Sequence, residues 1–221
     1  MPKRARNARD LDQLPYAHRL VAFDGELDRE GDHEFAHFDG DVFTDLDGGG
    51  SAFTSSAFSA VTFTAGRYRR ARFDDVWLHS VRVVGTDFAE SAWMDAEFTA
   101  CVLAGIEAFG TGMRRVAFHN CKFDSVNLRQ TKLREVSFVD CLLRDVDLAG
   151  ATLTDATFPG STLERIRLDN ATLTRVDLRG AAAVDIASGV AALSGATIDH
   201  AQLLDLAPAL AQHLGLTVKD Q

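Results

Sequence analysis

Every fifth residue from Phe38 to Leu203 stands in one continuous phase, and most positions in that phase carry Phe, Leu or another large apolar side chain. In an α-helix, positions five apart are rotated by about 140°, so these side chains would scatter around the cylinder. In a flat strand, an odd spacing would place alternate members on opposite faces. Only a chain that turns once per five-residue module points all of them inward. The phase therefore predicts an all-β solenoid whose coils, each of four modules, stack about 4.8 Å apart around a filled interior.

A small or β-branched residue stands two positions before most of these central residues, as at Cys121, Val126 and Thr131. Segments such as Ala151–Asp155 and Val146–Gly150 follow the pattern A(D/N)LXX, and through them the sequence resembles the pentapeptide repeat family. The resemblance covers roughly residues 36–205 and implies the fold of that family, a right-handed quadrilateral parallel β-helix. The pattern weakens in a few places, where we expect local irregularity: Gly48, Ala108, the Gly110–Gly112 stretch, Ala183 and Ser188.

The sequence predicts one domain in three parts. Residues 1–35 form an N-terminal tail and cap, residues 36–205 the pentapeptide repeat solenoid, and residues 206–221 a C-terminal helical cap and tail. The segment from residue 11 to residue 35 is out of phase but contains apolar residues such as Leu11, Leu14 and Tyr16. Because the first coil of a solenoid needs covering, we expect this segment to lie over that coil.

Near the C-terminal end, Ala207–Pro208 is typical of a helix start and Gly215 of a helix stop. Apolar side chains spaced four apart give this segment one stripe, and two more lie just beyond its end: Leu206, Leu210, Leu214, Leu216 and Val218. The stripe either seals the last coil only or also joins two molecules end to end into a homodimer. The second reading follows from the resemblance, because several bacterial members of the family dimerise through their C-terminal ends.

The chain has 32 acidic and 23 basic residues, for a formal net charge of −9. Such an acidic chain is not expected to coat nucleic acid or an anionic membrane, and no apolar run reaches the length of a membrane span. The start of the sequence contains Lys3, Arg4 and Arg6 but no apolar run behind them. This predicts no secretory signal and a cytoplasmic location. The short basic tail is expected to be solvated, and the alternative is an anionic partner for it.

Three cysteines lie 20 residues apart, in one inner column of adjacent coils: Cys101, Cys121 and Cys141. Three thiolates are too few for a closed zinc site, and stacked Cβ atoms about 4.8 Å apart lie beyond the usual disulfide range. We therefore expect reduced cysteines that fill space in the core. His79 and His119 share an outer column but lie two coils apart, about 10 Å, which is too far to share a metal. No phosphate-binding loop, zinc-protease motif or nucleophile elbow occurs, so the sequence predicts neither catalysis nor a metal or cofactor.

The predicted outer faces differ in charge. The most acidic face lies outside the column of Phe98 and Phe118, and its carboxylates are Asp39, Glu97, Asp140, Asp177 and Asp199, opposed by Arg179 alone. Trp77 is expected to be exposed beside them, and Phe109 beside the glycines near residue 110. Exposed aromatic side chains serve as anchors in protein interfaces. The acidic face with Trp77 is thus the predicted partner-binding surface.

These observations favour a non-enzymatic protein-binding scaffold or regulatory module that contacts a protein through its solenoid faces. The alternative is implied by the resemblance: some bacterial members protect DNA gyrase from quinolones by imitating duplex DNA, which would make a type II topoisomerase the partner and antibiotic tolerance the outcome. Duplex DNA as long as the predicted rod, ~40 Å, carries ~24 charges, against five carboxylates on the acidic face. The basic cluster around Arg67, Arg69, Arg70 and Arg72 also opposes mimicry.

Overall fold

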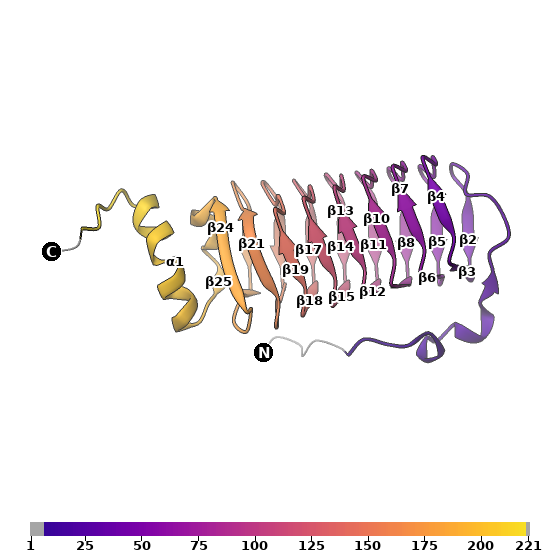
Figure 1. Ribbon diagram of the computed structural model, residues 1–221, viewed down its shortest axis with the longest axis horizontal. Coiled ribbons are helices and arrows are strands. Elements are labelled where there is room, and N and C mark those ends of the chain that lie inside the picture. Colours follow the sequence, from indigo (N-terminus) through magenta and orange to yellow (C-terminus); the bar gives the residue numbers. More distant parts are fainter. Residues whose placement is uncertain (1–6, 220–221) are drawn as a thin grey trace.

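The computed structural model describes residues 7–219, which form one rod of stacked coils with a helix at the C-terminal end (Figure 1). Strands pair in parallel with partners 20 residues away, as Phe118 pairs with Phe98 and Phe138. The predicted right-handed quadrilateral parallel β-helix is therefore confirmed. The basic start of the chain, with Lys3, Arg4 and Arg6, lies outside the described residues.

Three sides of the rod are sheets. Sheet A consists of β1 (Val21–Ala22), β3 (Ala36–Asp39), β6 (Ala57–Ser59), β9 (Trp77–His79), β12 (Glu97–Thr99), β15 (Ala117–His119) and β18 (Ser137–Val139). Sheet B consists of β2 (Asp32–Glu34), β5 (Ala52–Thr54), β8 (Arg72–Asp74), β11 (Ala92–Met94), β14 (Gly112–Arg114), β17 (Lys132–Arg134), β20 (Thr152–Thr154) and β22 (Thr172–Thr174). Sheet C consists of β4 (Val42–Thr44), β7 (Thr62–Thr64), β10 (Arg82–Val84), β13 (Val102–Ala104), β16 (Lys122–Asp124), β19 (Leu142–Arg144), β21 (Thr162–Arg167) and β24 (Ala183–Ser188).

The fourth side is held by single bridges, such as that between Glu107 and Asn127. The corners between the sides are formed by residues two positions after the central ones. These residues adopt the left-handed conformation, with φ of 51° at Asp145 and 69° at Gly150. Asp, Asn and Gly tolerate this conformation best. Backbone hydrogen bonds join neighbouring coils, for example from the Lys122 N–H to the Cys101 carbonyl at 2.9 Å.

The central side chains point inward and stack along the axis. The rings of Phe118 and Phe138 have centroids 5.0 Å apart and an interplanar angle of 8°, and Phe138 stacks on Phe158 in the same way at 5.0 Å and 4°. All three rings are buried. Each coil therefore buries its aromatic side chains against the coils above and below it, and an isolated coil would expose them.

The cysteine column lies inside this core as expected. Cys101, Cys121 and Cys141 are buried and free. The Cys121 thiol donates to the His119 carbonyl at 3.3 Å, and the Cys121 N–H donates to the Cys141 sulfur at 3.4 Å. Hydrogen bonding to the Cys101 thiol, together with burial, raises the pKa of the Cys121 thiol. The thiols are thus small protonated core groups that also satisfy backbone groups.

The predicted phase is wrong at one late coil. Leu163 pairs with Val184, although the continuous phase predicts Ala183 as its partner. Ile166 pairs with Ile186 in the predicted register, which shifts again where Arg167 pairs with Ser188. Ala183 is exposed and Val184 is buried. The physical reason is that alanines precede Val184, which is the first side chain there large enough to fill the interior. The irregularity expected at Gly110–Gly112 is absent, because β14 pairs in register on both sides.

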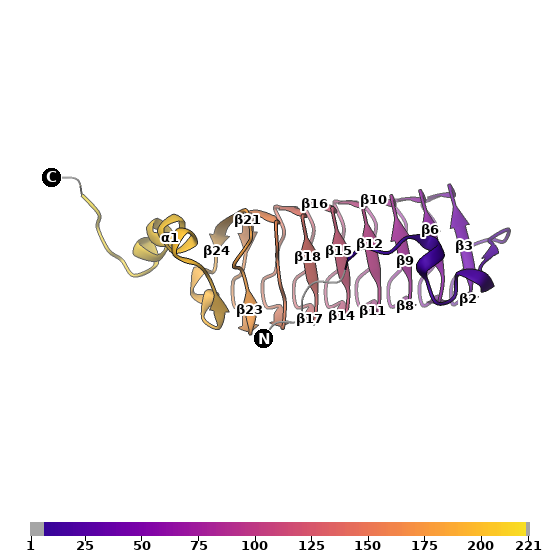
Figure 2. The same ribbon diagram turned by 90° about the horizontal axis from the view of Figure 1, so that it is seen from below.

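The boundaries of the solenoid also differ from the predicted ones. Strand β2 pairs in register with β5, so coil pairing begins before residue 36. Its His33 ring stacks on Phe53 with centroids 4.9 Å apart. Phe23 covers the end of the core, with its ring centroid 4.3 Å from that of Phe38. The preceding residues do not lie over the first coil. They contain two short turns, η1 (Leu11–Gln13) and η2 (Ala17–Arg19), and run along sheet A (Figure 2).

The C-terminal helix begins earlier than predicted. After η3 (Val190–Leu193) and the pairing of β23 (Val176–Asp177) with β25 (Ala196–Thr197), the helix α1 spans His200–His213. Asp199 caps it by accepting from the Gln202 N–H at 2.9 Å, and Pro208 lies inside the helix. The Asp199 cap outweighs Ala207–Pro208 as a start signal because it satisfies free N–H groups of the first turn. Leu203, predicted as a central residue, is consequently on the helix and exposed.

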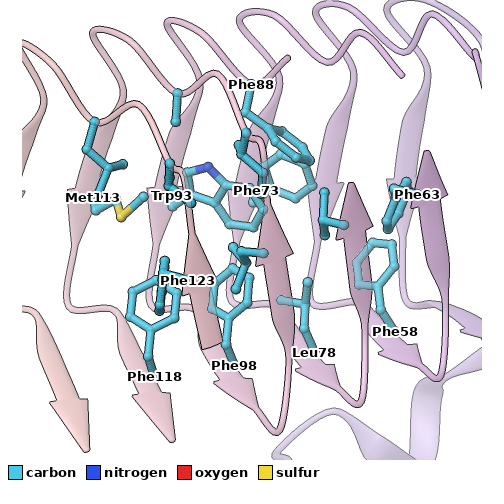
Figure 3. Close-up of a pocket in the computed structure, with 16 residues that line it drawn as sticks. Phe58, Phe63, Phe73, Leu78, Phe88, Trp93, Phe98, Met113, Phe118 and Phe123 are labelled. Carbon is cyan, nitrogen blue, oxygen red and sulfur yellow. The ribbon is translucent and has the colours of Figure 1, made fainter. Parts of the chain in front are cut away.

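The core is underfilled in the coils around Ala108. An internal cavity of about 40 Å³ lies there, and its lining is entirely apolar. Figure 3 shows Trp93 and Met113 on one side of it and Phe98 and Phe118 on the other. Ala108 lines the same cavity from a central position that most other coils fill with a large side chain.

Replacing Ala108 by leucine is expected to raise the free energy of unfolding by about 1 kcal/mol. The estimate follows from ~24 cal/mol for each Å³ of cavity filled and the volume of about 40 Å³. Chemical denaturation of the parent and the variant measures it. Ala104→Leu, which changes an outward side chain of the same coil, serves as the control and should leave stability within about 0.5 kcal/mol. A less stable Ala108→Leu variant would mean that the cavity cannot accept the larger side chain.

Candidate functional site

The predicted acidic face is the outer surface of sheet A and its continuation toward the C-terminal end, and much of it is engaged within the chain. Glu97 is 5% exposed and forms an ion pair with Arg9, with 2.8 Å between Arg9 Nε and Glu97 Oε2. Asp177 pairs with Arg179 at 2.8 Å. Hydrogen bonds from that guanidinium lower the pKa of the Asp177 carboxyl. Asp199 caps α1. The predicted set of five carboxylates is therefore not an open acidic surface.

Three carboxylates of the predicted set lie exposed, and one of them, Asp199, caps α1. Asp39 and Asp140 are at opposite parts of the rod, five coils apart along the repeat. Asp39 is followed by Asp41, whose carboxylate accepts from the Asp39 N–H at 3.0 Å. The structure does not bring Asp39 and Asp140 together, so they do not form one site.

Trp77 is buried, and its predicted exposure is wrong. Its side chain points outward from β9, but residues 9–22 lie across it, and it is 4% exposed. Its indole N–H donates to the Arg9 carbonyl at 3.0 Å. The solenoid pattern places Trp77 on the outside correctly. The pattern contains no information on the segment that covers it, because that segment has no repeat.

Residues 9–22, here called the N-terminal strap, are the main feature that the sequence did not predict. Leu14 and Tyr16 are 4% exposed and pack with Ala57 and Trp77 in a small apolar cluster separate from the main core. The Tyr16 hydroxyl donates to the Ser56 carbonyl at 3.4 Å. The available signals were an outward tryptophan on a surface of small residues and an apolar segment outside the phase.

His119 is buried, although the sequence places it in an outer column. It is 4% exposed, whereas His79 of the same column is exposed. Burial lowers the pKa of His119, and the nearby Glu97 partly opposes this. Within residues 7–219, no group of three or more His, Cys, Asp or Glu side chains could hold a metal ion. The internal cavity presents only apolar groups, so neither an acid, a base nor a nucleophile of its lining faces it.

Sheet B and the fourth side carry charges that are paired between coils. Arg175 contacts Asp155 at 2.6 Å, 20 residues earlier, and Arg115 pairs with Asp95 in the same way. The basic cluster is also partly neutralised: Arg67 lies 3.2 Å from Asp45 and Arg69 lies 3.1 Å from Asp87. These exposed pairs contribute little to stability. They do reduce the charge that sheet B and the fourth side offer to a partner.

Sheet C has an outer surface of a different kind. Strands β4, β7, β10 and β13 each turn two side chains outward, and all but Arg82 are uncharged: Val42, Thr44, Thr62, Thr64, Val84, Val102 and Ala104. We call these seven uncharged side chains the sheet C patch, in which Val42 is 70% exposed. Phe109 lies outside the patch and is 38% exposed, as predicted. Arg82 lies among the patch side chains, between Thr62 and Val102, and further charges such as Lys122 and Asp124 border the area. A mostly uncharged centre with a charged border resembles the centre and rim of a protein interface.

One family model and several solved structures are similar to this chain. The family model for the pentapeptide repeat region matches residues 111–188. No curated protein sequence matches the chain. Among solved structures, a trypsin-treated form of QnrB1, described as a plasmid-mediated fluoroquinolone resistance protein, is similar at 20% identity and a TM-score of 0.41, covering 91% of this chain and all of that one. HetL, from the cyanobacterium Nostoc sp. strain PCC 7120, is similar at 14% identity and a TM-score of 0.33, covering 77% of this chain and 90% of that one.

The stacked coils, the filled interior and the flat outer faces define a parallel β-solenoid, a class whose working surfaces are on its outside. Residues 111–188 match the pentapeptide repeat family model, and the same 20-residue strand register continues on both sides of them. The described helices include none long and apolar enough to cross a membrane.

Proposed function

We propose that this chain is a non-enzymatic scaffold that binds a partner protein through the sheet C patch. The observation that supports this most is the contrast between the outer faces. The strap covers the N-terminal half of sheet A, and sheet B carries ion pairs between coils. The side chains of the sheet C patch are uncharged, with Arg82 as the one charged neighbour among them, and no other segment of residues 7–219 lies over them.

The patch would form the centre of a larger contact. Four strands span about 14 Å across the patch and three residues span about 10 Å along it. Its area of roughly 140 Å² is less than the roughly 800 Å² that each partner of a stable complex contributes. The surrounding corners extend it with small residues such as Ala65, Gly85 and Gly105. Asp45 and Lys122 border it and would provide charged contacts at the rim. The predicted cytoplasmic location stays a prediction.

The test uses partner capture with matched variants. Proteins that bind the purified parent chain are identified and then titrated against the double variant Thr64→Lys and Val102→Lys, which places charge in the patch. Affinity is expected to fall about tenfold or more, because an uncompensated charge would be desolvated at the centre of the contact. The control is Thr154→Lys with Thr174→Lys, which makes the same number of changes on sheet B. Binding that is equal in all three proteins would reject the patch.

The DNA-mimic alternative has less support from the geometry. Glu97, Asp177 and Asp199 are engaged within the chain, which leaves Asp39 and Asp140 apart on the acidic face. QnrB1 is described as a fluoroquinolone resistance protein, and a gyrase supercoiling assay tests whether that role extends to this chain. No inhibition of supercoiling and no relief of a quinolone block are expected at low salt. Either effect would replace the scaffold proposal with a topoisomerase partner and antibiotic tolerance.

We also propose that two copies join at their C-terminal ends. Of the predicted interface residues, Leu206 is 2% exposed and packs on the core, and Leu210 is partly buried against it. Leu214 and Leu216 are 70% and 61% exposed. Three further apolar side chains are exposed at this end: Leu203, Leu204 and Val218. Such a cluster of exposed apolar residues is typical of an interaction site.

The dimer is tested with the double variant Leu214→Asp and Leu216→Asp. Light scattering is expected to give a dimer mass for the parent and a monomer mass for the variant, since a carboxylate would be desolvated in the interface. The unfolding free energy of the monomeric variant should remain within about 0.5 kcal/mol of that of a parent sample diluted below its dissociation constant. A parent that scatters as a monomer at high concentration would show that α1 is a cap only.

A further inference from the structure

The N-terminal strap contacts sheet A as a bound peptide contacts a receptor (Figure 2). At one end, Arg9 makes three polar contacts with two outward side chains. Its Nε donates to Glu97 Oε2 at 2.8 Å, its backbone N–H donates to Glu97 Oε1 at 2.6 Å, and its carbonyl accepts from the Trp77 indole at 3.0 Å. The Glu97 carboxylate is 5% exposed beneath this contact. Glu97 and Trp77 thus bind both the side chain and the backbone of Arg9.

The middle and the far end of the strap use two other kinds of contact. Leu14 and Tyr16 pack against Ala57 and Trp77 and are as buried as core residues. Strand β1 then adds to the edge of sheet A, where the Val21 N–H donates to the Phe35 carbonyl at 2.9 Å. Strand addition combined with side-chain pockets is a recurring mode of peptide recognition.

The surface beneath the strap is formed by the solenoid alone. Ala57, Trp77 and Glu97 come from β6, β9 and β12, which pair in register with one another. The coils therefore set the positions of these three side chains. The strap itself has no core, since its two short turns η1 and η2 contain no buried residues. The receptor surface is preorganised, and the strap is the part that can be exchanged.

We propose that Ala57, Trp77 and Glu97, together called the Trp77 groove, bind an extended segment of a partner protein that carries an arginine followed by a leucine and an aromatic residue. The strap occupies the groove as an intramolecular competitor. This inference rests on the proposed function as a protein-binding scaffold, and it adds a second surface, the chemistry of its ligand and a control on its access.

Competition between the tethered strap and a separate peptide sets the apparent affinity of the Trp77 groove. A tethered segment has an effective concentration in the millimolar range. A partner segment of equal intrinsic affinity therefore competes poorly at micromolar concentration, and its apparent affinity falls with the fraction of open groove. Loosening the strap should raise the affinity of the groove for a peptide supplied separately.

The test uses a fluorescent synthetic peptide with the sequence of residues 7–22 and the full chain in three forms. The parent has the strap in place. The released variant carries Arg9→Ala, Leu14→Ala and Tyr16→Ala, which remove the charge and apolar contacts of the strap. The control variant carries Asp12→Ala, a change at an exposed strap residue. The peptide is expected to bind the released variant at least about tenfold more tightly than the parent or the control.

A charge exchange tests the contact itself. Adding Glu97→Arg to the released variant is expected to lower its affinity for the unmodified peptide by at least about tenfold, because the arginine of the peptide would meet a like charge. A peptide with the Arg9→Glu change should regain affinity for that variant. Circular dichroism checks that Glu97→Arg folds. If it does not, Glu97→Gln, which keeps the shape of the side chain, replaces it and should also lower the affinity for the peptide.

Tryptophan fluorescence decides between the outcomes. Trp93 is buried in the core and gives a constant signal, so release of the strap is expected to move the emission of Trp77 to longer wavelength, and bound peptide should move it back. An unmoved emission in the released variant would mean that the strap is a fixed part of the fold. A shifted emission without peptide binding, or binding indifferent to Glu97→Arg, would also overturn the proposal. Lysine substitutions in the sheet C patch should leave peptide binding unchanged, which separates this test from that of the proposed function.

Discussion

Replacing Phe118 by alanine is expected to lower the free energy of unfolding by about 3–5 kcal/mol. The ring stacks between Phe98 and Phe138, with centroid distances of 4.6 and 5.0 Å, and it is 1% exposed. It also lines the existing cavity, so its removal would enlarge a space that the coil already leaves unfilled. Rigid coils above and below limit the collapse that could reduce the loss. Equilibrium chemical denaturation, followed by the circular dichroism of the β-sheets, measures the change in the free energy of unfolding.

Phe109→Ala is the matched control for this prediction. It removes the same atoms from the module two before that of Phe118, but Phe109 points away from the core and is 38% exposed. Its expected effect is within about 0.5 kcal/mol. Similar losses in both variants would show that the inward column does not dominate stability in this part of the rod.

Leu206→Ala is expected to cost about 2–5 kcal/mol by loosening the seal at the C-terminal end. Leu206 is 2% exposed and is the apolar side chain of α1 that is most deeply packed on the core. Gln202 of the same helix face donates to the Leu178 carbonyl at 2.7 Å, which also ties the helix to the last coils. In a rod stabilised by contacts between neighbours, loss of a cap should first expose the adjacent coil. Amide hydrogen exchange in Leu206→Ala is therefore expected to be faster than in the parent. The increase should be largest in β24 and β25 and smaller toward the middle of the rod.

The opposite face of the helix provides the comparison. Leu204→Ala changes a side chain that is 63% exposed, and it should leave the unfolding free energy within about 0.5 kcal/mol. Equal protection of the last coils in Leu206→Ala and the parent would contradict the role of Leu206 as a cap.

The sequence predicted the repeating part of the fold almost residue by residue, since one period assigns each side chain to the inside or the outside. Phe118, Cys121 and Trp93 are all buried where that period places them. The prediction was wrong where a side chain of suitable size was missing from the phase. Val184 is turned inward in the place expected for Ala183, because the interior must be filled and alanine is too small to do so.

The candidate site was less predictable because it depends on segments that have no period. Trp77 was placed correctly on the outside, but its burial follows from a contact with Arg9 that no spacing rule connects to it. The start of α1 was misplaced for a related reason. Pro208 is a strong local signal, and the Asp199 cap with Gln202 became decisive only once the chain had left the last coil.

The distance along the chain between the strap and its binding surface has a consequence for biosynthesis. Arg9 and Glu97 are 88 residues apart, so Arg9 is translated first and cannot form its ion pair until Glu97 has been synthesised. At about 5–20 residues per second, the ribosome needs roughly 4–18 s to add that length of polypeptide. During this interval the nascent chain carries an unattached arginine and tyrosine segment, while coils that already contain Trp77 are being completed. The strap therefore closes over its surface only after Glu97 has been synthesised.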